Sequence, residues 1–216
     1  MALDGPYTLK QFLALTSSGR ARKQAAARFR GHDPNCCAIG SCPRKHIAQQ
    51  SGSCLRKHKN SVVIGIDPGT RCVGWGVIET DGHALKLAAC GCIRPKAHLE
   101  LKDRLSEIFT QLEAVLARTR PQAAALEETF AGVNMKSAIA MGEGRGIALL
   151  CLARANLEVL ELSPRSIKHA ITGSGAASKA RVAAMVAAQL RLAQAPRPAD
   201  ITDALAAAIA LARRGG

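Results

Sequence analysis

Three short β patterns joined by tight turns constrain the fold of this chain more than any other feature. The run VVIGID at 62–67 is apolar up to its final residue, and it is followed by Pro68, which has no N–H to donate to a sheet. Strand patterns resume at 72–79 and 84–93, and Asp81-Gly82 between them is a hairpin signal. We therefore expect an antiparallel meander of three strands.

Strand and helix patterns alternate in the rest of the chain. The expected elements are a helix from Leu101 that ends before Pro121, a strand at 123–127, a helix from about Asn134, a strand at 157–162 and three further helices. Helix-start signals occur at Ser163-Pro164 and at Ser178, and Gly173 is a stop signal. The pattern predicts an α/β architecture, with a mixed five-stranded sheet and helices on both faces.

The positive charge of the chain is concentrated in its first part. The net charge of the 216 residues is +14. Residues 1–60 hold 11 Lys/Arg against 2 Asp/Glu, which leaves +9, and residues 61–216 hold 19 against 14, which leaves +5. A basic surplus favours an anionic partner such as nucleic acid. It can also serve solubility alone.

The sequence shows neither an apolar run long enough for a membrane span nor a secretory signal pattern. We therefore expect a cytoplasmic protein that does not bind membranes. Its eight cysteines, in a chain without an export signal, are expected to be reduced thiols rather than disulfides.

Residues 1–60 and 61–216 are expected to differ in kind. The first segment has no sustained periodicity, and we expect a disordered basic extension or an artefact of an upstream gene start. A zinc site is the alternative, because CPRKH at 42–46 and CLRKH at 54–58 repeat a Cys-x3-His pattern.

Four acidic residues stand where carboxylates can converge. Asp67 ends the first strand and Glu127 ends the fourth, and these strands can be neighbours whose carboxyl ends share one edge of the sheet. Asp200 and Asp203 lie three residues apart at the start of the last helix, so both project from one face. Each also has a structural interpretation: a turn cap for Asp67, a solvated strand end for Glu127, and helix capping for the pair.

Converging carboxylates repel one another unless cations lie between them. Oxygen ligands that leave room for water and phosphate are typical of Mg²⁺. Two such ions can activate a water and stabilise the leaving oxygen in phosphodiester hydrolysis. On this hypothesis Asp67 is held at its strand end as a metal ligand.

Four blocks of sequence resemble the RuvC family of Holliday junction resolvases. They are GIDPGTRCVGWGVIE, GCIRPK, ALEETFAGVNMKSAIAMGEGRG and ADITDALAAAIA, and the resemblance covers about residues 62 to 214. It implies a ribonuclease H-like fold and a homodimer that cuts a four-way DNA junction with Mg²⁺, two ions per site, for which Mn²⁺ can substitute. It also implies the RuvA and RuvB branch-migration proteins as partners. The family's four catalytic acids and metal ligands would fall on Asp67, Glu127, Asp200 and Asp203.

Residues around these acids are candidates for contacts with DNA. Phe130 can stack on an unpaired base, as the family's aromatic at this place does, or it can pack inward. The resemblance places basic cleft residues at Lys168 and Lys179, which flank a glycine loop, and Arg181 is a weaker candidate. Solvated surface lysine is the alternative.

The helix expected from about Asn134 carries Gly142, Gly144 and Gly146, and each glycine costs roughly 1 kcal/mol relative to alanine. Ala138, Gly142 and Gly146 share one stripe. Such a stripe can pack against the protein's own sheet, and the resemblance implies that this helix contributes to a dimer interface.

Other functions are compatible with parts of the pattern. A YqgF-like ribonuclease H-fold nuclease that acts on RNA has a similar first strand, although GCIRPK together with EETFAGVNMKSA is not expected there. Actin-like ATPases share an Asp-x-Gly loop but need a second phosphate loop. A non-catalytic junction-binding module is disfavoured because all four acids are present. We therefore predict a structure-specific endonuclease that resolves Holliday junctions during homologous recombination and DNA repair.

Overall fold

The computed structural model describes residues 61–128 and 135–214. The predictions for residues 1–60, including the zinc hypothesis, lie outside the described residues, as does the one for Phe130. Within the described ranges, no helix combines the length and the apolar character needed to cross a bilayer.

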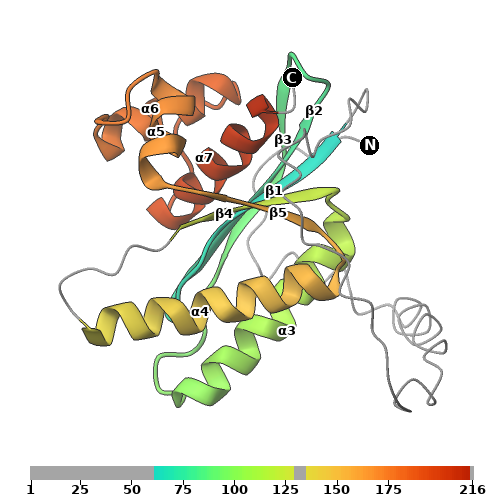
Figure 1. Cartoon of the computed structure of the whole chain (residues 1–216), viewed down its shortest axis with the longest axis vertical. Coiled ribbons are helices and arrows are strands. Elements are labelled where there is room, and N and C mark those ends of the chain that lie inside the picture. Colours follow the sequence, from blue (N-terminus) through green and yellow to red (C-terminus); the bar gives the residue numbers. More distant parts are fainter. Residues whose placement is uncertain (1–60, 129–134, 215–216) are drawn as a thin grey trace, which may run out of the picture. The chain divides into compact units, whose positions relative to one another are not determined.

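A mixed five-stranded sheet forms the centre of the fold (Figure 1). Its strands are β1 (Ser61–Asp67), β2 (Val73–Thr80), β3 (Leu85–Ile93), β4 (Ala123–Glu127) and β5 (Glu158–Leu162). They lie in the order β3-β2-β1-β4-β5. The first three pair antiparallel, whereas β4 runs parallel to both β1 and β5. The meander and the two added strands are confirmed, with boundaries within one residue of those expected.

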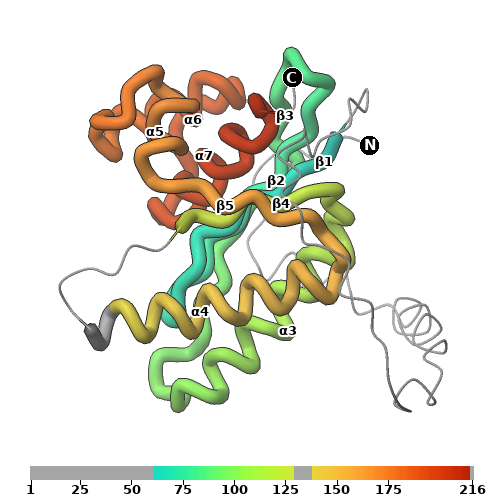
Figure 2. Tube along the Cα trace, in the orientation of Figure 1, coloured from blue at the N-terminus to red at the C-terminus, as the bar shows by residue number. Residues whose placement is uncertain are grey.

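Five helices of the described residues surround the sheet. They are α3 (Leu101–Thr119), α4 (Met135–Arg154), α5 (Pro164–Thr172), α6 (Lys179–Gln189) and α7 (Ala199–Arg214). The chain trace shows α3 and α4 on one side of the sheet and α5, α6 and α7 on the other (Figure 2). Helices on both faces, together with the strand order, confirm the predicted ribonuclease H-like architecture.

The expected turn and cap residues act as their chemistry predicts. The Ser163 and Ser178 side chains accept hydrogen bonds from backbone N–H groups three residues further on, at the starts of α5 and α6. Gly173 ends α5 in the left-handed conformation, with φ of 76°. Asp81 Oδ1 accepts from the backbone N–H groups of His83 and Ala84, which closes the hairpin between β2 and β3.

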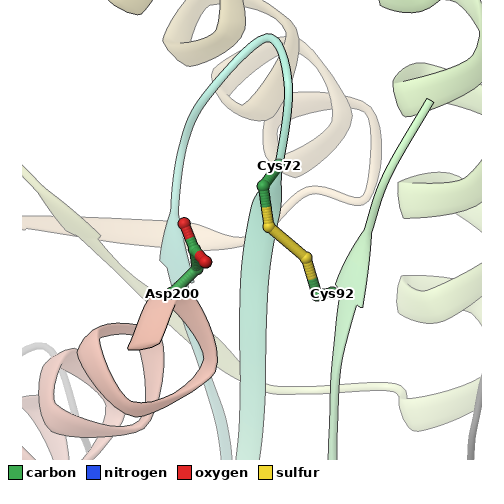
Figure 3. Close-up of side chains that lie close together, drawn as sticks. All are labelled: Cys72, Cys92 and Asp200. Carbon is green, nitrogen blue, oxygen red and sulfur yellow. A yellow bond between two sulfur atoms is a disulfide. The ribbon is translucent and has the colours of Figure 1, made fainter. Parts of the chain in front are cut away.

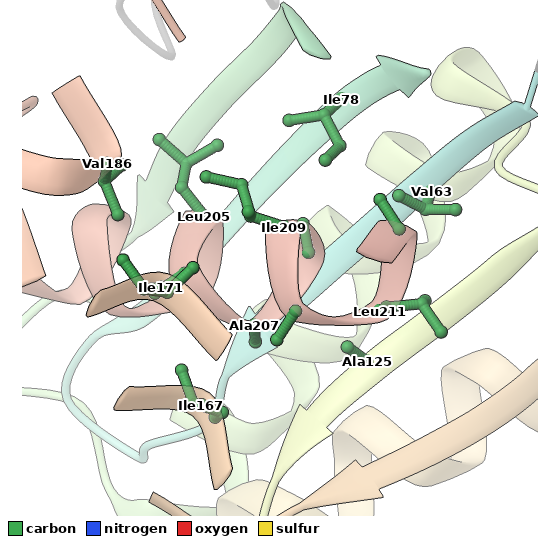
Figure 4. Close-up of a cluster of buried hydrophobic side chains, with 14 of the residues drawn as sticks. Val63, Ile78, Ala125, Ile167, Ile171, Val186, Leu205, Ala207, Ile209 and Leu211 are labelled. Carbon is green, nitrogen blue, oxygen red and sulfur yellow. The ribbon is translucent and has the colours of Figure 1, made fainter. Parts of the chain in front are cut away.

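Helix α7 packs directly on the sheet, and small residues make this possible. A methyl group at Gly65 would lie 1.9 Å from the carbonyl oxygen of Ala204, and one at Gly76 would meet Leu205. The core on this face joins α7 to the strands and to α5 and α6 through Val63, Ile78, Ala125, Ile167, Ile171, Val186, Leu205, Ala207, Ile209 and Leu211 (Figure 4). The absent Cβ atoms bring the α7 backbone onto β1 and β2 and so fix the place where α7 begins.

The alternation of side chains along β1 divides its residues between the two faces. Val63 and Gly65 face α7, and Asp67 follows in the same phase. Ile64 and Ile66 are fully buried in the opposite phase, on the side of α3 and α4. The apolar run therefore has two covered faces, and Asp67 is directed toward α7.

Candidate functional site

Asp67 and Glu127 end two adjacent parallel strands. The register between β1 and β4 pairs Ile66 with Leu126, so the next residue of each strand lies beside the other. Glu127 is in phase with Ala123 and Ala125, which belong to the α7-facing core. The expectation that strands one and four are neighbours is confirmed, and both carboxylates lie on the α7 side of the sheet.

The first turns of α7 supply Asp200 and Asp203. The helix begins at Ala199, so Asp200 lies within its first turn. Gly74, which pairs with Asp67 across β1 and β2, lies under this turn: a methyl group there would be 2.0 Å from the Asp200 carbonyl oxygen. Because Gly74 has no side chain, the start of α7 can lie directly against β2, next to Asp67.

The electrostatics of Asp67 show that the four acids act on one another. Burial, followed by the charges of Glu127, Asp203 and Asp200 in decreasing order, raises its pKa from 3.8 to about 7. Lys179 opposes this rise. Asp67 is therefore only partly ionised at neutral pH, and an approaching cation would favour its ionised form. Of the two helix acids, Asp203 affects it more strongly.

Glu127 shows the same coupling. Its pKa is raised by burial and by the charge of Asp203, against the opposing charges of Lys179 and Lys168. The tightest electrostatic group is therefore Asp67, Glu127 and Asp203, with Asp200 at its edge.

The two candidate lysines differ in their contacts, and both face the acids. Lys179 Nζ lies 3.3 Å from Asp203 Oδ2, and this contact raises the pKa of the lysine. Lys168 is half-buried and acts on Glu127 through its charge. The Arg181 side chain is exposed, and it is not among the charges that move the pKa of Asp67 or Glu127. Both lysines are therefore close enough to act on the acids, whereas Arg181 shows no such coupling to Asp67 or Glu127, and the DNA contacts of all three stay predictions.

Arg145 of α4 holds the end of β4 and was not predicted from the sequence. Its Nη1 donates to the backbone carbonyl oxygen of Glu127 at 2.8 Å, and its Nη2 binds the Glu161 carboxylate on β5. The guanidinium thus ties two neighbouring strands together beside a candidate ligand. The available signal was an arginine inside the glycine-rich run MGEGRG.

Gly144, one residue earlier, holds the turn that follows Asp67. A methyl group at this position would lie 2.7 Å from the backbone carbonyl carbon of Gly69. The prediction of close backbone contact is therefore correct for Gly144. Among the described residues of one protomer, a methyl group at Gly142 or Gly146 would touch nothing within 4 Å, so these two glycines do not serve close packing on the protein's own sheet there.

A disulfide joins Cys72 to Cys92 beside Asp200, so the expectation of reduced thiols is wrong for this pair (Figure 3). The register of β2 and β3 explains it: Cys92 lies opposite Gly74, two residues after Cys72, and the Cα atoms are 6.3 Å apart. Cys90 and Cys151 are free and buried. The sequence separation of 20 residues gave no indication of this pairing.

The carboxylates suit a hard divalent cation. Carboxylate oxygens are the ligands that Mg²⁺ prefers, and a bound cation would offset the repulsion that raises the pKa of Asp67. Within the part of the chain that the structure describes, no three of the four acids have ligand atoms within 4.8 Å of one another. This wider spacing leaves room for water and phosphate between them.

Most of the described part of the chain is similar to proteins of one family. The family model for "Crossover junction endodeoxyribonuclease RuvC" matches residues 63–211. The RuvC of Heliobacterium modesticaldum is 45% identical over 151 residues, 70% of this chain and 93% of its own length. The RuvC of Chlorobaculum parvum is 44% identical over 154 residues, which are 71% of this chain and 82% of the relative.

Solved structures agree with this match. RuvC of Thermus thermophilus in complex with Holliday junction substrate superposes with a TM-score of 0.66 at 35% identity, covering 69% of this chain and 92% of that one. The yeast mitochondrial Holliday junction resolvase Ydc2 has a TM-score of 0.53 at 14% identity, a likeness of fold alone.

Proposed function

This chain belongs to the RuvC family of crossover junction endodeoxyribonucleases, and we propose that it resolves Holliday junctions by paired, metal-dependent hydrolysis of phosphodiester bonds. The observation that carries the proposal is the placement of Asp67 and Glu127 at the ends of adjacent parallel strands, beside the start of α7 that carries Asp200 and Asp203. Burial and the charges of the other three acids raise the pKa of Asp67 there. A buried acid of this kind, surrounded by others and faced by two lysines, is typical of a catalytic centre. Homologous recombination and DNA repair are the processes in which it would act.

The carboxylates would hold two Mg²⁺ ions, for which Mn²⁺ can substitute. Bound there, such ions supply an activated water and a counter-charge for the leaving oxygen. Asp67, Glu127 and Asp203 are the ligands that their electrostatic coupling favours most. Asp200, which acts on Asp67 least, would be the outermost ligand.

The lysines would receive the DNA backbone. Lys179 now neutralises Asp203, and it is placed to exchange that carboxylate for a phosphate oxygen of the substrate. Lys168 lies near enough to Glu127 to act on its charge, so it would contact a phosphate on the β4 side of the site. Phe130, which follows Glu127 by three residues in the sequence, would stack on an unpaired base at the junction centre.

A homodimer would place two such sites on one junction. On α4, Ile139, Met141 and Leu150 are 57%, 37% and 48% exposed, and Ile139 and Leu150, eleven residues apart, lie on one face of the helix where a second copy can cover them. The open space over Gly142 and Gly146 supports the same helix as the contact between protomers. A cytoplasmic location and cooperation with RuvA and RuvB complete the proposal, and they rest on the family alone.

The direct test is cleavage of a labelled mobile four-way junction with Mg²⁺, with duplex DNA and structured RNA as comparison substrates. Asp67→Asn, Glu127→Gln and Asp203→Asn should each abolish cutting while junction binding survives, because each removes a ligand and also negative charge facing DNA. Glu158→Gln is the matched control, since Glu158 is an exposed carboxylate at the opposite end of β5. Near-normal cutting by one of the three variants would remove that residue from the site. Cutting of RNA in preference to the junction would overturn the proposed substrate.

A further inference from the structure

A second group of metal-ligand side chains lies beside the carboxylate site. Cys72 directly precedes β2, Cys92 lies on β3, and Asp200 lies in the first turn of α7 (Figure 3). The two sulfur atoms and a carboxylate oxygen of Asp200 all lie within 4.8 Å of one another. Across residues 61–128 and 135–214, this is the one group of three or more His, Cys, Asp or Glu side chains that meets this distance.

The backbone fixes this arrangement. Gly74 is paired with Cys92 on one side and with Asp67 on the other, so these residues form one row across three strands. Asp200 rests on the glycine of this row, where its Cβ would be 3.0 Å from a methyl group at position 74. Asp200 therefore lies between the sulfur pair and the other carboxylates, and its side chain is half-buried, as are both cysteines.

Two thiolates and a carboxylate are ligands for a softer cation than Mg²⁺. Zinc accepts sulfur at about 2.3 Å and carboxylate oxygen at about 2.1 Å in tetrahedral sites, which puts its ligand atoms about 3.6–3.8 Å apart. Thiolates select zinc and similar ions over magnesium. Once the sulfur–sulfur bond is broken, the two sulfurs can separate to such a spacing while Asp200 stays within reach.

We propose that Cys72, Cys92 and Asp200 form, after reduction of the disulfide, a binding site for a thiophilic divalent cation such as Zn²⁺. Reduction by a phosphine breaks the S–S bond: water supplies its oxygen to the phosphine oxide and its two hydrogens to the sulfurs. Binding of Zn²⁺ then releases the two thiol protons and forms two Zn–S bonds and one Zn–O bond. The disulfide form lacks both thiolates and closes the site.

Occupation of this site withdraws Asp200 from the nuclease centre. This consequence rests on the proposed function, because it requires Asp200 to take part in catalysis. Zinc bound by the reduced protein is then an inhibitor that competes with Mg²⁺ for the shared carboxylate, and the disulfide form, which has no thiolates to offer, escapes this inhibition.

The test measures metal binding separately from cleavage. Cysteines in the N-terminal segment would also bind metal, so the experiment uses the full chain with Cys36, Cys37, Cys42 and Cys54 replaced by serine. This protein is reduced with a phosphine, desalted without oxygen and titrated with Co²⁺, whose bond to thiolate gives a charge-transfer absorption. We expect one equivalent of Co²⁺ with this absorption, displaced by Zn²⁺, and none in the oxidised protein.

Substitutions assign the ligands. Cys72→Ala and Cys92→Ala should each weaken Co²⁺ binding by more than about tenfold, because loss of a supporting partner alone costs roughly 10–100-fold. Cys90→Ala is the matched control, since Cys90 is a free thiol two residues away on the same strand, and it should bind as before. Absence of thiolate charge transfer in the reduced protein, or its survival in both variants, would overturn the site.

Cleavage assays then test the consequence. Zn²⁺ should inhibit the reduced protein, each variant being compared with its own zinc-free rate, and Cys72→Ala should be inhibited far less. If the variants lose the charge-transfer absorption but zinc inhibits them as strongly as before, the metal site stands. Its proposed effect on Asp200 is then wrong. A protein that binds Co²⁺ as described but cuts no junction would contradict the proposed nuclease function instead.

Discussion

Helices α4 and α7 are both rich in small residues, alanine in α7 and alanine with glycine in α4, yet they meet the sheet in opposite ways. From Ile201 to Ala212, α7 is buried at every residue except Asp203, because glycines in the strands admit its backbone. Helix α4 instead contacts the rest of the protomer through one face, and it leaves Ile139 and Leu150 exposed on another. Small residues thus serve internal packing in α7 and leave an open surface on α4.

The two helices also act on the site in different ways. Helix α7 carries two of the acids itself and sets their position by its contact with β1 and β2. Helix α4 carries none of them, but it holds the turn after Asp67 through Gly144 and the end of β4 through Arg145. The site is therefore positioned from both faces of the sheet.

The largest effect is expected where α7 meets β1. In Gly65→Ala, the new methyl group would lie 1.9 Å from the Ala204 carbonyl oxygen and 2.6 Å from the Ala208 nitrogen, both of them backbone atoms that cannot rotate away. Ordinary overpacking in cores costs about 1–3 kcal/mol, and an overlap this close between a β1 residue and backbone atoms of α7 is expected to cost more than that range. We expect loss of the native fold, measured by circular dichroism and thermal melting. A variant that melts like the wild type would show that α7 is less firmly seated than its contacts indicate.

The next largest effect on stability is expected from the raised pKa of Asp67. Its folded pKa of about 7 lies above the ordinary 3.8, so the folded state retains a proton that the unfolded chain loses. The stability that this proton provides is fully present below pH 3.8 and is lost as pH rises through about 7. The three-unit difference corresponds to about 4 kcal/mol.

Asp67→Asn should remove this pH dependence. In metal-free buffer the variant should exceed the wild type in free energy of unfolding at pH 8 by up to about 4 kcal/mol, and by less at pH 5. Urea denaturation at the two pH values measures this, and added Mg²⁺ should stabilise only the wild type. If both proteins lose the same free energy of unfolding between pH 5 and pH 8, the pH dependence does not come from Asp67.

A smaller effect is expected for Arg145, which acts on the site from α4. Arg145→Met leaves the Glu127 carbonyl oxygen and the Glu161 carboxylate without this donor, and charge-assisted hydrogen bonds contribute about 1.5–3 kcal/mol. We expect a loss of stability in this range and a rise in the Mg²⁺ concentration needed for half-maximal cleavage.

Arg154→Met is the matched control for this prediction. Arg154 lies on the same helix and also binds an acid, Glu113, but it contacts α3 rather than the strand ends. It should lower stability without changing the Mg²⁺ requirement. If both variants shift that requirement equally, Arg145 has no special role in positioning Glu127.

Much of this arrangement could be read from the sequence because it depends on local signals. The Asp67-Pro68 break, the serine caps and the spacing of Asp200 and Asp203 are each determined within a few residues. The disulfide and the Arg145 contact depend instead on strand register and on helix placement. Cys92 meets Cys72 only because β2 and β3 pair Gly74 with Cys92, and no local pattern encodes that offset.

The smallest predicted change compares two glycines on α4. Gly142→Ala meets open space among the described residues of the protomer, so the helix should gain up to about 1 kcal/mol from the better helix former. Gly144→Ala, two residues away, would meet the Gly69 backbone at 2.7 Å and should destabilise instead. Thermal melting of dilute protein measures both, and sedimentation of concentrated protein reports the dimer. If Gly142 lies where two copies approach closely, Gly142→Ala should stabilise the protomer and weaken its association; unchanged association would place the dimer contact elsewhere on α4 or off this helix.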